Sequence, residues 1–466
     1  MRDDVKALKL FLEIPPPRPR KRLKAISLFS GAGIGDYGYY LAGFDFVVQV
    51  ELDGKRAQVG QSNFPSSTWI VGDIRERYEN VVETYARRSS APLDLLIATP
   101  PCQGMSSSNP GRGKRGSSLE RRYEEKNKLA LWAAFVARRL KPRVIVMENV
   151  PAFLSAKVHY QGKFERVVDH LGDLLGEDYD FFEAVINVAN YGIPQARRRA
   201  ILVALRKDLA QVEALKREGR MLLPSPTHSE AGEEGAYPWI TIREWFEFMN
   251  YEPLDSRERE LAAGSHPLHK VPDYTRNPDR YLQIRQIPPY SGKSAYENST
   301  CLSCGFENVP LGLATCPACG DILRNRPYVV EEGVPRLIKG FHSSYRRIAP
   351  NKPAPTITTN SSHVGSDFKI HPWEHRVLSV LEVADLQTVP RYFNWHPALR
   401  RRQVYLIRQV VGEAFPTYFA YLHGKIIYKI LRGKYTTTTM ARALSESAGA
   451  EGASGGDNAN LACVSC

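Results

Sequence analysis

The residue that first suggests chemistry in this chain is Cys102. The stretch from Leu93 to Ser108 reads LDLLIATPPCQGMSSS, so an apolar run ends at two prolines and the thiol follows at once. The run is typical of a strand covered on both faces, and it should end at Pro100 and Pro101, which cannot donate to a sheet ladder. Cys102 would then stand at the carboxyl edge of a sheet, where open α/β sheets bind ligands. A lone cysteine can equally be a small buried side chain, so its neighbours must decide.

A carboxylate is expected at the same edge. Glu148 stands near the end of a second apolar run, RVIVMENVP. If both strands end at one edge, Cys102 and Glu148 face one cleft. A carboxyl group could hold a protonated ring nitrogen and donate a proton while a thiolate attacks the ring. The pair therefore fits nucleophilic addition to a pyrimidine.

Two arginines alternate in the stretch PQARRRAILVA, which enters another apolar run. On an extended segment Arg197 and Arg199 point to the same side, as does Gln195. Arginines aligned in this way suit recognition of an oxyanion or a phosphate. A solvated sheet edge would show the same pattern.

A glycine turn and two acids suggest a nucleoside cofactor. FSGAGIG, from Phe29 to Gly35, lies between a predicted strand and a predicted helix, and Glu51 and Asp73 end the next two predicted strands. Backbone N–H groups in such a turn can approach a ligand, Glu51 could accept from ribose hydroxyls, and Asp73 from an adenine amino group. Singly, each feature also fits tight packing or a solvated strand end. Together they favour an adenosine-containing cofactor without a triphosphate, because the lysine of a P-loop is missing.

The elements that must position these residues follow an α/β pattern. Apolar strands alternate with helix-like segments, which predicts a Rossmann-like, doubly wound, mostly parallel sheet. The predicted strands are AISLF, DFVVQVELD, STWIVGDI, LDLLIATPP, RVIVMENVP, YDFFEAVINVA and RRRAILVALR, and the clearest helix is NKLALWAAFVARRL.

Composition divides the chain into five parts. Residues 1–24 end in PPPRPRKRLK and are expected to form a basic, proline-rich arm outside the core. The α/β pattern covers residues 25–206. Residues 207–345 are rich in Pro, Gly, His and charge, which predicts a smaller inserted domain. Helical patterns return in residues 346–436, and the glycine-rich residues 437–466 are expected to be disordered.

Charge favours an anionic partner. The 466 residues carry a formal net charge of +13, which suits nucleic acid. No run of 18 apolar residues and no signal-peptide core appears, so we expect a soluble, cytoplasmic protein without a membrane partner.

Four of the seven cysteines suggest a metal site. They lie in CLSCGFENVPLGLATCPACG, two C-x2-C pairs separated by eleven residues, and a glycine follows each pair (Gly305 and Gly320). Four thiolates in this spacing predict a structural zinc bound in a zinc-ribbon-like module. The expected ligands are Cys301, Cys304, Cys316 and Cys319. The pair Cys463 and Cys466 in the tail is assigned no metal.

The motifs together resemble a known family. FSGAGIG, PPCQG, MENVP, QARRR, RRIAPNKPAPTITT and VLSVLEVADLQTVP occur in this order between Ala25 and about Ile427. They closely resemble the ordered motifs of the cytosine-C5 DNA methyltransferases, including those of type II restriction-modification systems. The inserted region stands where that family keeps its target-recognition domain.

The resemblance implies roles for the site residues. Cys102 would add to carbon 6 of a flipped-out cytosine, Glu148 would hold N3 and the exocyclic amine, and Arg197 and Arg199 would support the base. Glu51 would bind the ribose of S-adenosylmethionine. The other residues implied at the cofactor are Phe29, Gly31, Gly33, Asp73, Ile74 and Pro101.

The resemblance also implies contacts with double-stranded DNA by a monomer. The segment after Cys102 would close over the base, with Arg112, Lys114, Arg115, Arg121 and Arg122 as candidate phosphate contacts. In the insert the candidate DNA contacts are Arg276, Arg280, Tyr281, Arg285, Tyr290, Lys293 and Arg324. A restriction endonuclease for the same site is a further candidate partner.

One departure and two alternatives remain open. Glu413, in GEAFP, stands where the family usually has Asn, near the amino-acid end of the cofactor. A tRNA cytosine-C5 methyltransferase would share the chemistry, and a catalytically weak DNA-binding relative would share the fold.

Overall fold

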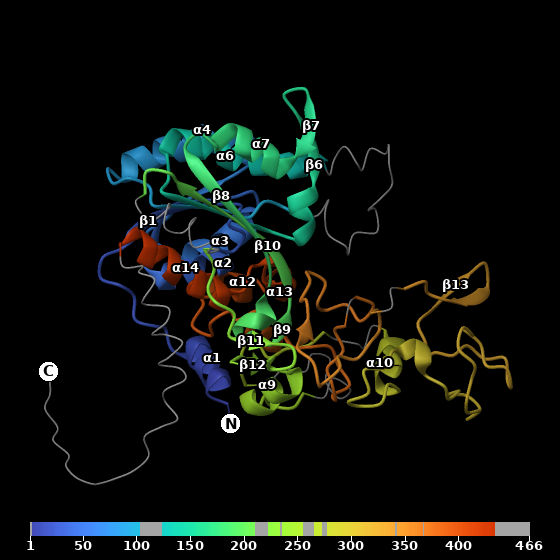
Figure 1. The fold of residues 1–466 in the computed structure, drawn as a ribbon. Helices are drawn as coiled ribbons and strands as arrows, with labels where there is room; N and C mark the ends of the chain where they lie inside the picture. Colours follow the sequence, from blue (N-terminus) through green and yellow to red (C-terminus); the bar gives the residue numbers. More distant parts are fainter. Residues whose placement is uncertain are drawn as a thin grey trace, which may run out of the picture.

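The computed structural model describes residues 2–102, 124–209, 222–233, 235–254, 265–272, 277–340, 343–366 and 368–433. Its centre is a seven-stranded sheet with the order β3-β2-β1-β4-β5-β10-β8 (Figure 1). The strands are β1 (Leu23–Leu28), β2 (Phe44–Glu51), β3 (Thr68–Val71), β4 (Leu95–Ala98), β5 (Val144–Asn149), β8 (Tyr179–Asn187) and β10 (Arg198–Arg206). Each overlaps one of the predicted apolar segments, although β1 and β2 begin two residues and one residue earlier than predicted.

The sheet is mixed but mainly parallel. Strands β1 to β5 pair in parallel, and β10 runs antiparallel to both β5 and β8. The segment between β8 and β10 holds only the short turn η2 (Val188–Tyr191) and the two-residue β9 (Gln195–Ala196). Because a parallel connection needs a dozen or more residues, this short link favours the antiparallel neighbour. The doubly wound prediction is thus confirmed, with one reversed strand that it did not contain.

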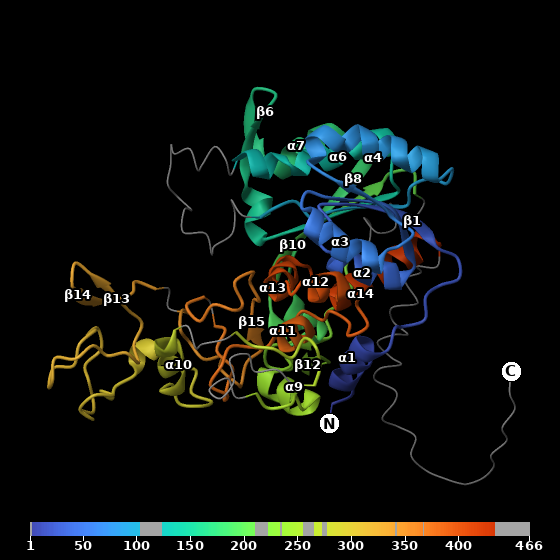
Figure 2. The ribbon, with the colours of Figure 1, turned by 180° about the vertical axis from the view of Figure 1, so that it is seen from behind.

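Helices cover both faces of the sheet. On one face lie α4 (Ile74–Arg88), α6 (Ala130–Leu140) and α7 (Val167–Leu175), and on the other lie α2 (Ile34–Ala42) and α14 (Thr417–Leu431) (Figures 1 and 2). Each face buries its own apolar cluster against the sheet. This two-sided burial explains why the strands are almost continuously apolar.

The C-terminal helix packs very closely on the first helix of the sheet domain. A Cβ placed on Gly38 of α2 would lie 2.4 Å from the carbonyl oxygen of Thr417, so only glycine permits this approach. The Thr417 hydroxyl also donates to the carbonyl of Ile34 at 3.1 Å. Residues almost four hundred positions apart therefore meet beside the glycine turn.

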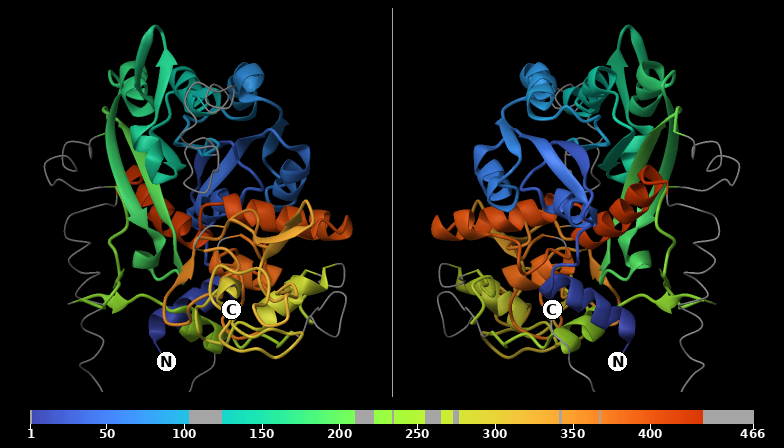
Figure 3. Two further views of the ribbon diagram at one scale, coloured as in Figure 1. Left: turned by 90° about the vertical axis from the view of Figure 1, so that its right-hand side faces the viewer. Right: turned by 90° about the vertical axis from the view of Figure 1, so that its left-hand side faces the viewer.

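The inserted region forms a second, more irregular lobe (Figure 3). Two small apolar clusters hold it, one around Ile284 and Ile370 and one around Cys301 and Cys316. Its elements are β11 (His228–Ser229), β12 (Tyr237–Pro238), α9 (Ile242–Met249), α10 (Pro278–Arg285), η3 (Ala295–Glu297), β13 (Tyr328–Glu331) and β14 (Val334–Leu337). The short elements η1 (Pro151–Ser155), β6 (Lys157–Tyr160) and β7 (Lys163–Arg166) belong to the sheet domain and lie beside α7, and β15 (Ala354–Pro355) follows the insert.

The chain returns to the sheet domain through α11 (Val380–Leu386), α12 (His396–Arg400) and α13 (Val404–Glu413). Strand β15 pairs in parallel with β9, so the returning chain is hydrogen-bonded to the segment that leads into β10. Together with α3 (Gly54–Asn63), these elements surround the carboxyl ends of β1 and β2.

The N-terminal arm is not outside the core as expected. Residues Asp3–Glu13 form helix α1, in which Val5, Leu8 and Leu12 are buried. The ring of Phe11 lies 4.9 Å from that of Tyr418 on α14. The prediction is therefore wrong for this helix, because apolar residues at helical spacing precede the proline-rich segment and pack against the rest of the chain.

Two further expectations concern residues that the structure does not describe. The candidate phosphate contacts from Arg112 to Arg122 and the tail 437–466, with Cys463 and Cys466, lie outside the described residues. Among the residues that are described, no helix is long and apolar enough to cross a membrane.

Candidate active site and cofactor cleft

The segment that carries Cys102 is held from both sides. The side-chain amide of Asn149, the last residue of β5, donates to the carbonyl of Pro100 at 2.9 Å. The hydroxyl of Thr99 donates to the carbonyl of Phe29 in the glycine turn at 3.0 Å. These contacts place the partly exposed thiol between the end of β5 and the glycine turn. The motif MENVP contained Asn149, but sequence reasoning gave it no role.

Glu148 and Arg199 form an ion pair beside the thiol. Glu148 faces Ile201 across the antiparallel β5–β10 pair, so Arg199, two residues from Ile201, lies diagonally on the same face. Its Nε lies 2.8 Å from Oε1 of Glu148, and the two side chains are 11% and 10% exposed. The structure thus brings Arg199 to Glu148, and both are near enough to Cys102 to influence the pKa of its thiol.

Electrostatics couple these three groups. Burial raises the pKa of Glu148, and the nearby guanidinium groups of Arg199 and Arg197 oppose that rise. Burial also raises the pKa of the Cys102 thiol, which Arg199 lowers and Glu148 raises further. In this state Cys102 favours the neutral thiol and Glu148 holds a proton more readily than a solvated carboxylate. Such a carboxyl group suits proton donation at a substrate.

Arg197 corrects the expectation that both arginines face the substrate. Its side chain is fully buried, and its guanidinium donates to the carbonyls of Ile357, Gly412 and Ala414 at 2.8, 2.9 and 2.9 Å. The reason is that Arg197 lies at the break between β9 and β10, so the strict alternation of one strand does not apply. Arg197 therefore joins the returning chain to the sheet. Gln195 does the same, because its amide donates to the Leu386 carbonyl at 2.9 Å.

The glycine turn has the backbone of a ligand-binding loop. Phe29, Gly31 and Gly33 have φ angles of +63°, +57° and +76°. Glu51, at the end of β2, accepts from the backbone N–H groups of Gly31 at 2.8 Å and Asp53 at 3.0 Å. Glu51 thus fixes the turn, and each of its oxygens retains acceptor capacity for a hydroxyl.

Below the turn, Asp36 is a polar residue that sequence reasoning missed. Its carboxylate is buried and accepts from Ser27 at 2.9 Å and Gln49 at 2.8 Å. Burial raises the pKa of Asp36 to about 6. These bonds tie the first turn of α2 to β1 and β2, directly under the glycine turn.

The two residues predicted to contact an adenine are less available. Asp73 caps α4 and bonds to its neighbour Arg75, while Ile74 is buried in the core. Leu52, which follows Glu51, is 68% exposed, unusual for a large apolar side chain. Leu52 was not predicted, and its only sequence signal is its place after Glu51.

The four predicted zinc ligands come together. The Sγ atoms of Cys301 and Cys319 lie 3.8 Å apart, those of Cys304 and Cys316 lie 3.7 Å apart, and all four lie within 4.8 Å of one another. The two pairs form identical turns, because Gly305 N–H donates to the Cys301 carbonyl as Gly320 N–H does to that of Cys316. Both glycines have positive φ, at +75° and +79°, as the tight turn requires.

The candidate DNA contacts in the insert differ in availability. Arg285, Tyr290 and Lys293 are exposed, and Arg280 and Tyr281 are partly buried. Arg324 is exposed but bound to Asp279, with Nη2 2.6 Å from Oδ1. Arg276 lies outside the described residues.

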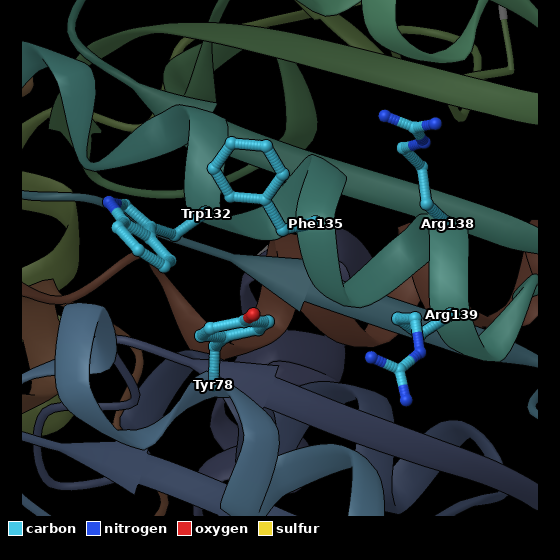
Figure 4. A pocket seen from close by; sticks show the side chains of 5 residues that line it. All are labelled: Tyr78, Trp132, Phe135, Arg138 and Arg139. Carbon is cyan, nitrogen blue, oxygen red and sulfur yellow. The ribbon is translucent and has the colours of Figure 1, made fainter.

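A separate pocket of about 360 Å³ lies between α4 and α6 (Figure 4). It is lined by Tyr78, Trp132, Phe135, Arg138 and Arg139. None of the predicted site residues lines this pocket, so it is distinct from the candidate site at the strand ends.

The coupling of charges predicts how Cys102 reacts with an alkylating reagent. Its apparent pKa should exceed the ordinary value of about 8.5. Glu148→Gln should lower it by removing a negative neighbour, and Arg199→Met should raise it. The measurement is the pH dependence of iodoacetamide modification of the Cys102 peptide, followed by mass spectrometry.

Glu79→Gln, which removes an exposed carboxylate on α4, is the matched control and should leave the profile unchanged. Shifts of opposite sign, or equal shifts in all three variants, would contradict this description of the site.

The comparisons with known proteins agree with this geometry. Residues 23–429 match the family model described as C-5 cytosine-specific DNA methylase. The chain is 29% identical to the type II methyltransferase M1.HgaI of Avibacterium volantium, over 85% of this chain and 96% of that protein. It is 25% identical to the type II methyltransferase M.NgoFVII of Neisseria gonorrhoeae, over 91% of each.

Among solved structures, a mutant DNMT2 of Spodoptera frugiperda has a TM-score of 0.50 at 15% identity, covering 87% of this chain and 99% of that one. That likeness supports the fold alone. The family match spans the glycine turn, the Cys102 segment, the Glu148–Arg199 pair and the returning helices, and on this ground the chain belongs to the C-5 cytosine-specific DNA methylases.

Proposed function

We propose that the protein is a DNA (cytosine-5)-methyltransferase that methylates carbon 5 of a cytosine in a specific duplex sequence, using S-adenosylmethionine. The observation that carries the proposal is the placement of Cys102 beside the Glu148–Arg199 pair, with the glycine turn at the neighbouring strand end. A nucleophile, a proton-holding carboxyl group and a nucleoside cradle thus share one sheet edge.

Residues of the cleft fit the cofactor. Glu51 has acceptor capacity for the ribose hydroxyls, and the turn from Phe29 to Gly33 can approach the ligand closely. The exposed Leu52 would cover one face of the adenine, and Asp73 would accept from its amino group if it leaves Arg75. Bound there, S-adenosylmethionine supplies an electrophilic methyl group.

Cys102 and Glu148 make the cytosine reactive. The thiol of Cys102 would lose its proton to a water molecule, and the thiolate would form a bond to carbon 6. Glu148 holds N3 and gives it a proton, so the electron pair of the ring collects at carbon 5. Carbon 5 would take the methyl group, with S-adenosylhomocysteine as the leaving group. Loss of the carbon 5 proton to water would then restore the double bond between carbons 5 and 6 and expel the thiolate, while N3 returns its proton to Glu148. Arg199 is a positioning residue here, since it holds the carboxyl group of Glu148.

The depth of the site requires base flipping. Only about a tenth of the Glu148 side chain is exposed (10%), so a base stacked in a duplex could not reach it. The base must leave the helix, at a cost of a few kcal/mol, which contacts elsewhere on the DNA must offset. We assign that task to the inserted lobe and to the basic segment after Cys102.

Duplex DNA is the substrate we favour over RNA. The relatives cited above are named type II methyltransferases, the net charge is +13, and the inserted lobe provides exposed cations such as Arg285 and Lys293. A DNA substrate would place the enzyme in the cytoplasm, and a restriction endonuclease for the same site remains a candidate partner. A tRNA substrate is the alternative that the chemistry permits.

We further propose that Cys301, Cys304, Cys316 and Cys319 bind a structural zinc ion. Four thiolates on two matching turns suit tetrahedral zinc, and they leave no open position for catalysis. The surrounding cluster contains little else, only Val309 and Leu323 beside two of the cysteines. Zinc would therefore supply much of the stability of this part of the insert.

Methyl transfer tests the central proposal. Radiolabel from S-adenosylmethionine should appear in duplex DNA and not in tRNA, and Cys102→Ser should abolish it while the cofactor still binds. Cytosine-conversion sequencing of the product would give the recognition site. Label in tRNA alone would select the alternative substrate, and cofactor binding with no label in either would indicate a DNA-binding relative without activity.

Metal analysis tests the zinc site. The purified chain should contain one zinc ion, and Cys316→Ser, which removes a buried ligand, should lose it and lower the melting temperature. Cys102→Ser should retain the metal. A wild-type chain free of zinc, or zinc retained in Cys316→Ser, would contradict the assignment.

A further inference from the structure

The end of helix α13 lies against the glycine turn. Glu413 is the last residue of α13, and Phe415 follows two residues later. A Cβ placed on Gly35 would lie 3.4 Å from the Cβ of Phe415, which is van der Waals contact. Glu413 is thus anchored at the carboxyl ends of β1 and β2, although it is 378 positions from Gly35 in the sequence.

Glu413 forms a two-pronged ion pair with Arg56. Nη1 of Arg56 lies 2.8 Å from Oε2, and Nη2 lies 3.1 Å from Oε1. The side chains of Arg56 and Glu413 are 24% and 34% exposed, so the pair is accessible at one side. Because Arg56 lies in the first turn of α3, the pair joins the helix after β2 to the returning chain.

The pair is electrostatically coupled to the proposed ribose site. Burial raises the pKa of Glu413; Arg56 opposes the rise, and the carboxylates of Glu51 and Asp53 add to it. Glu51 is therefore near enough to influence Glu413. A ligand held by Glu51 would find Arg56 and Glu413 at the same end of the sheet.

The amino-acid end of S-adenosylmethionine carries an ammonium and a carboxylate. A single cation or anion in the protein would attract one of these groups and repel the other. An ion pair offers both signs: the carboxylate oxygens of Glu413 can accept from an ammonium, and the remaining N–H groups of Arg56 can donate to a carboxylate. Such a pair recognises a zwitterion without changing the net charge of the cleft.

We propose that the Arg56–Glu413 ion pair binds the zwitterionic amino-acid end of the cofactor. The inference rests on the proposed function and assigns it two further binding residues. It also explains the departure at position 413, since a carboxylate in place of a neutral Asn needs a cation beside it, and Arg56 is that cation.

Binding calorimetry without any DNA tests the inference. The ligands are S-adenosylhomocysteine, which has the amino-acid end, and 5′-methylthioadenosine, which lacks it. Arg56→Gln and Glu413→Gln should each lower the affinity for S-adenosylhomocysteine about tenfold or more. This is the range expected for the loss of a charge-assisted hydrogen bond. In both variants the affinity for 5′-methylthioadenosine should stay within about twofold of the wild-type value. In the double variant the fold-loss of affinity for S-adenosylhomocysteine should be smaller than the product of the two single fold-losses, because the pair acts as a unit.

The control is Arg401→Gln. Arg401 donates to the side chain of Gln58 at 2.7 Å, and Gln58 lies on α3, as Arg56 does. Loss of this contact should change the affinity for neither ligand. Equal weakening of both ligands in the Arg56 and Glu413 variants would overturn the inference, since it would indicate a structural role. Unchanged affinities would overturn it as well. A wild-type chain that binds neither ligand would overturn the proposed function itself, which separates the two failures.

Discussion

Glu148 and Arg199 form a nearly buried ion pair at one edge of the sheet, and the rest of the site depends on this pair. A carboxylate buried alone would take up a proton and stay neutral, and a guanidinium buried alone would be costly. Paired at 2.8 Å, the two side chains hold each other beside Cys102, and the guanidinium of Arg199 opposes the rise that burial causes in the pKa of Glu148. Removing one partner of such a pair typically costs about 3–5 kcal/mol, because the other charge remains buried. The pair therefore constrains both the chemistry and the stability of this edge.

The fold supplies that pair through one reversed strand. Because β10 lies antiparallel between β5 and β8, Arg199 lies at the start of β10, at the same edge where β5 ends with Glu148 and Asn149. Arg197, just before β10, clamps the carbonyls that end α13 and so brings Glu413 to the glycine turn. Asn149, just after Glu148, binds the Pro100 carbonyl and so places Cys102. Catalytic residues and proposed cofactor-binding residues are thus positioned by residues that lie one or two places away from Glu148 or Arg199 in the sequence.

The site residues that the sequence predicts are mostly those at the ends of strands. Cys102, Glu148, Glu51 and the glycine turn all stand at strand ends, and strand ends are recognisable because apolar runs stop there. The cysteine pairs were predictable from their spacing alone. The reversed direction of β10 could have been suspected from the short link after β8, but the sequence pattern itself is the same for either direction.

The features that were missed depend on distant partners. Arg197 looks like a substrate-facing arginine because its true acceptors, main-chain carbonyls after position 356, have no sequence signature. Helix α1 was assigned to an arm because its partner, Tyr418, comes from the other end of the chain. Arg56 and Glu413 are 357 positions apart, and only the fold shows that they meet.

Trapping the covalent intermediate tests the account most directly. In duplex DNA with 5-fluorocytosine at the target position, carbon 5 carries fluorine and cannot lose a proton, so the thiolate cannot leave after methylation. We expect a covalent protein–DNA complex that forms only with S-adenosylmethionine and is absent in Cys102→Ser. Mass spectrometry should find the base joined to the Cys102 peptide. A complex joined through another residue, or efficient methylation of ordinary cytosine by Cys102→Ser, would contradict it.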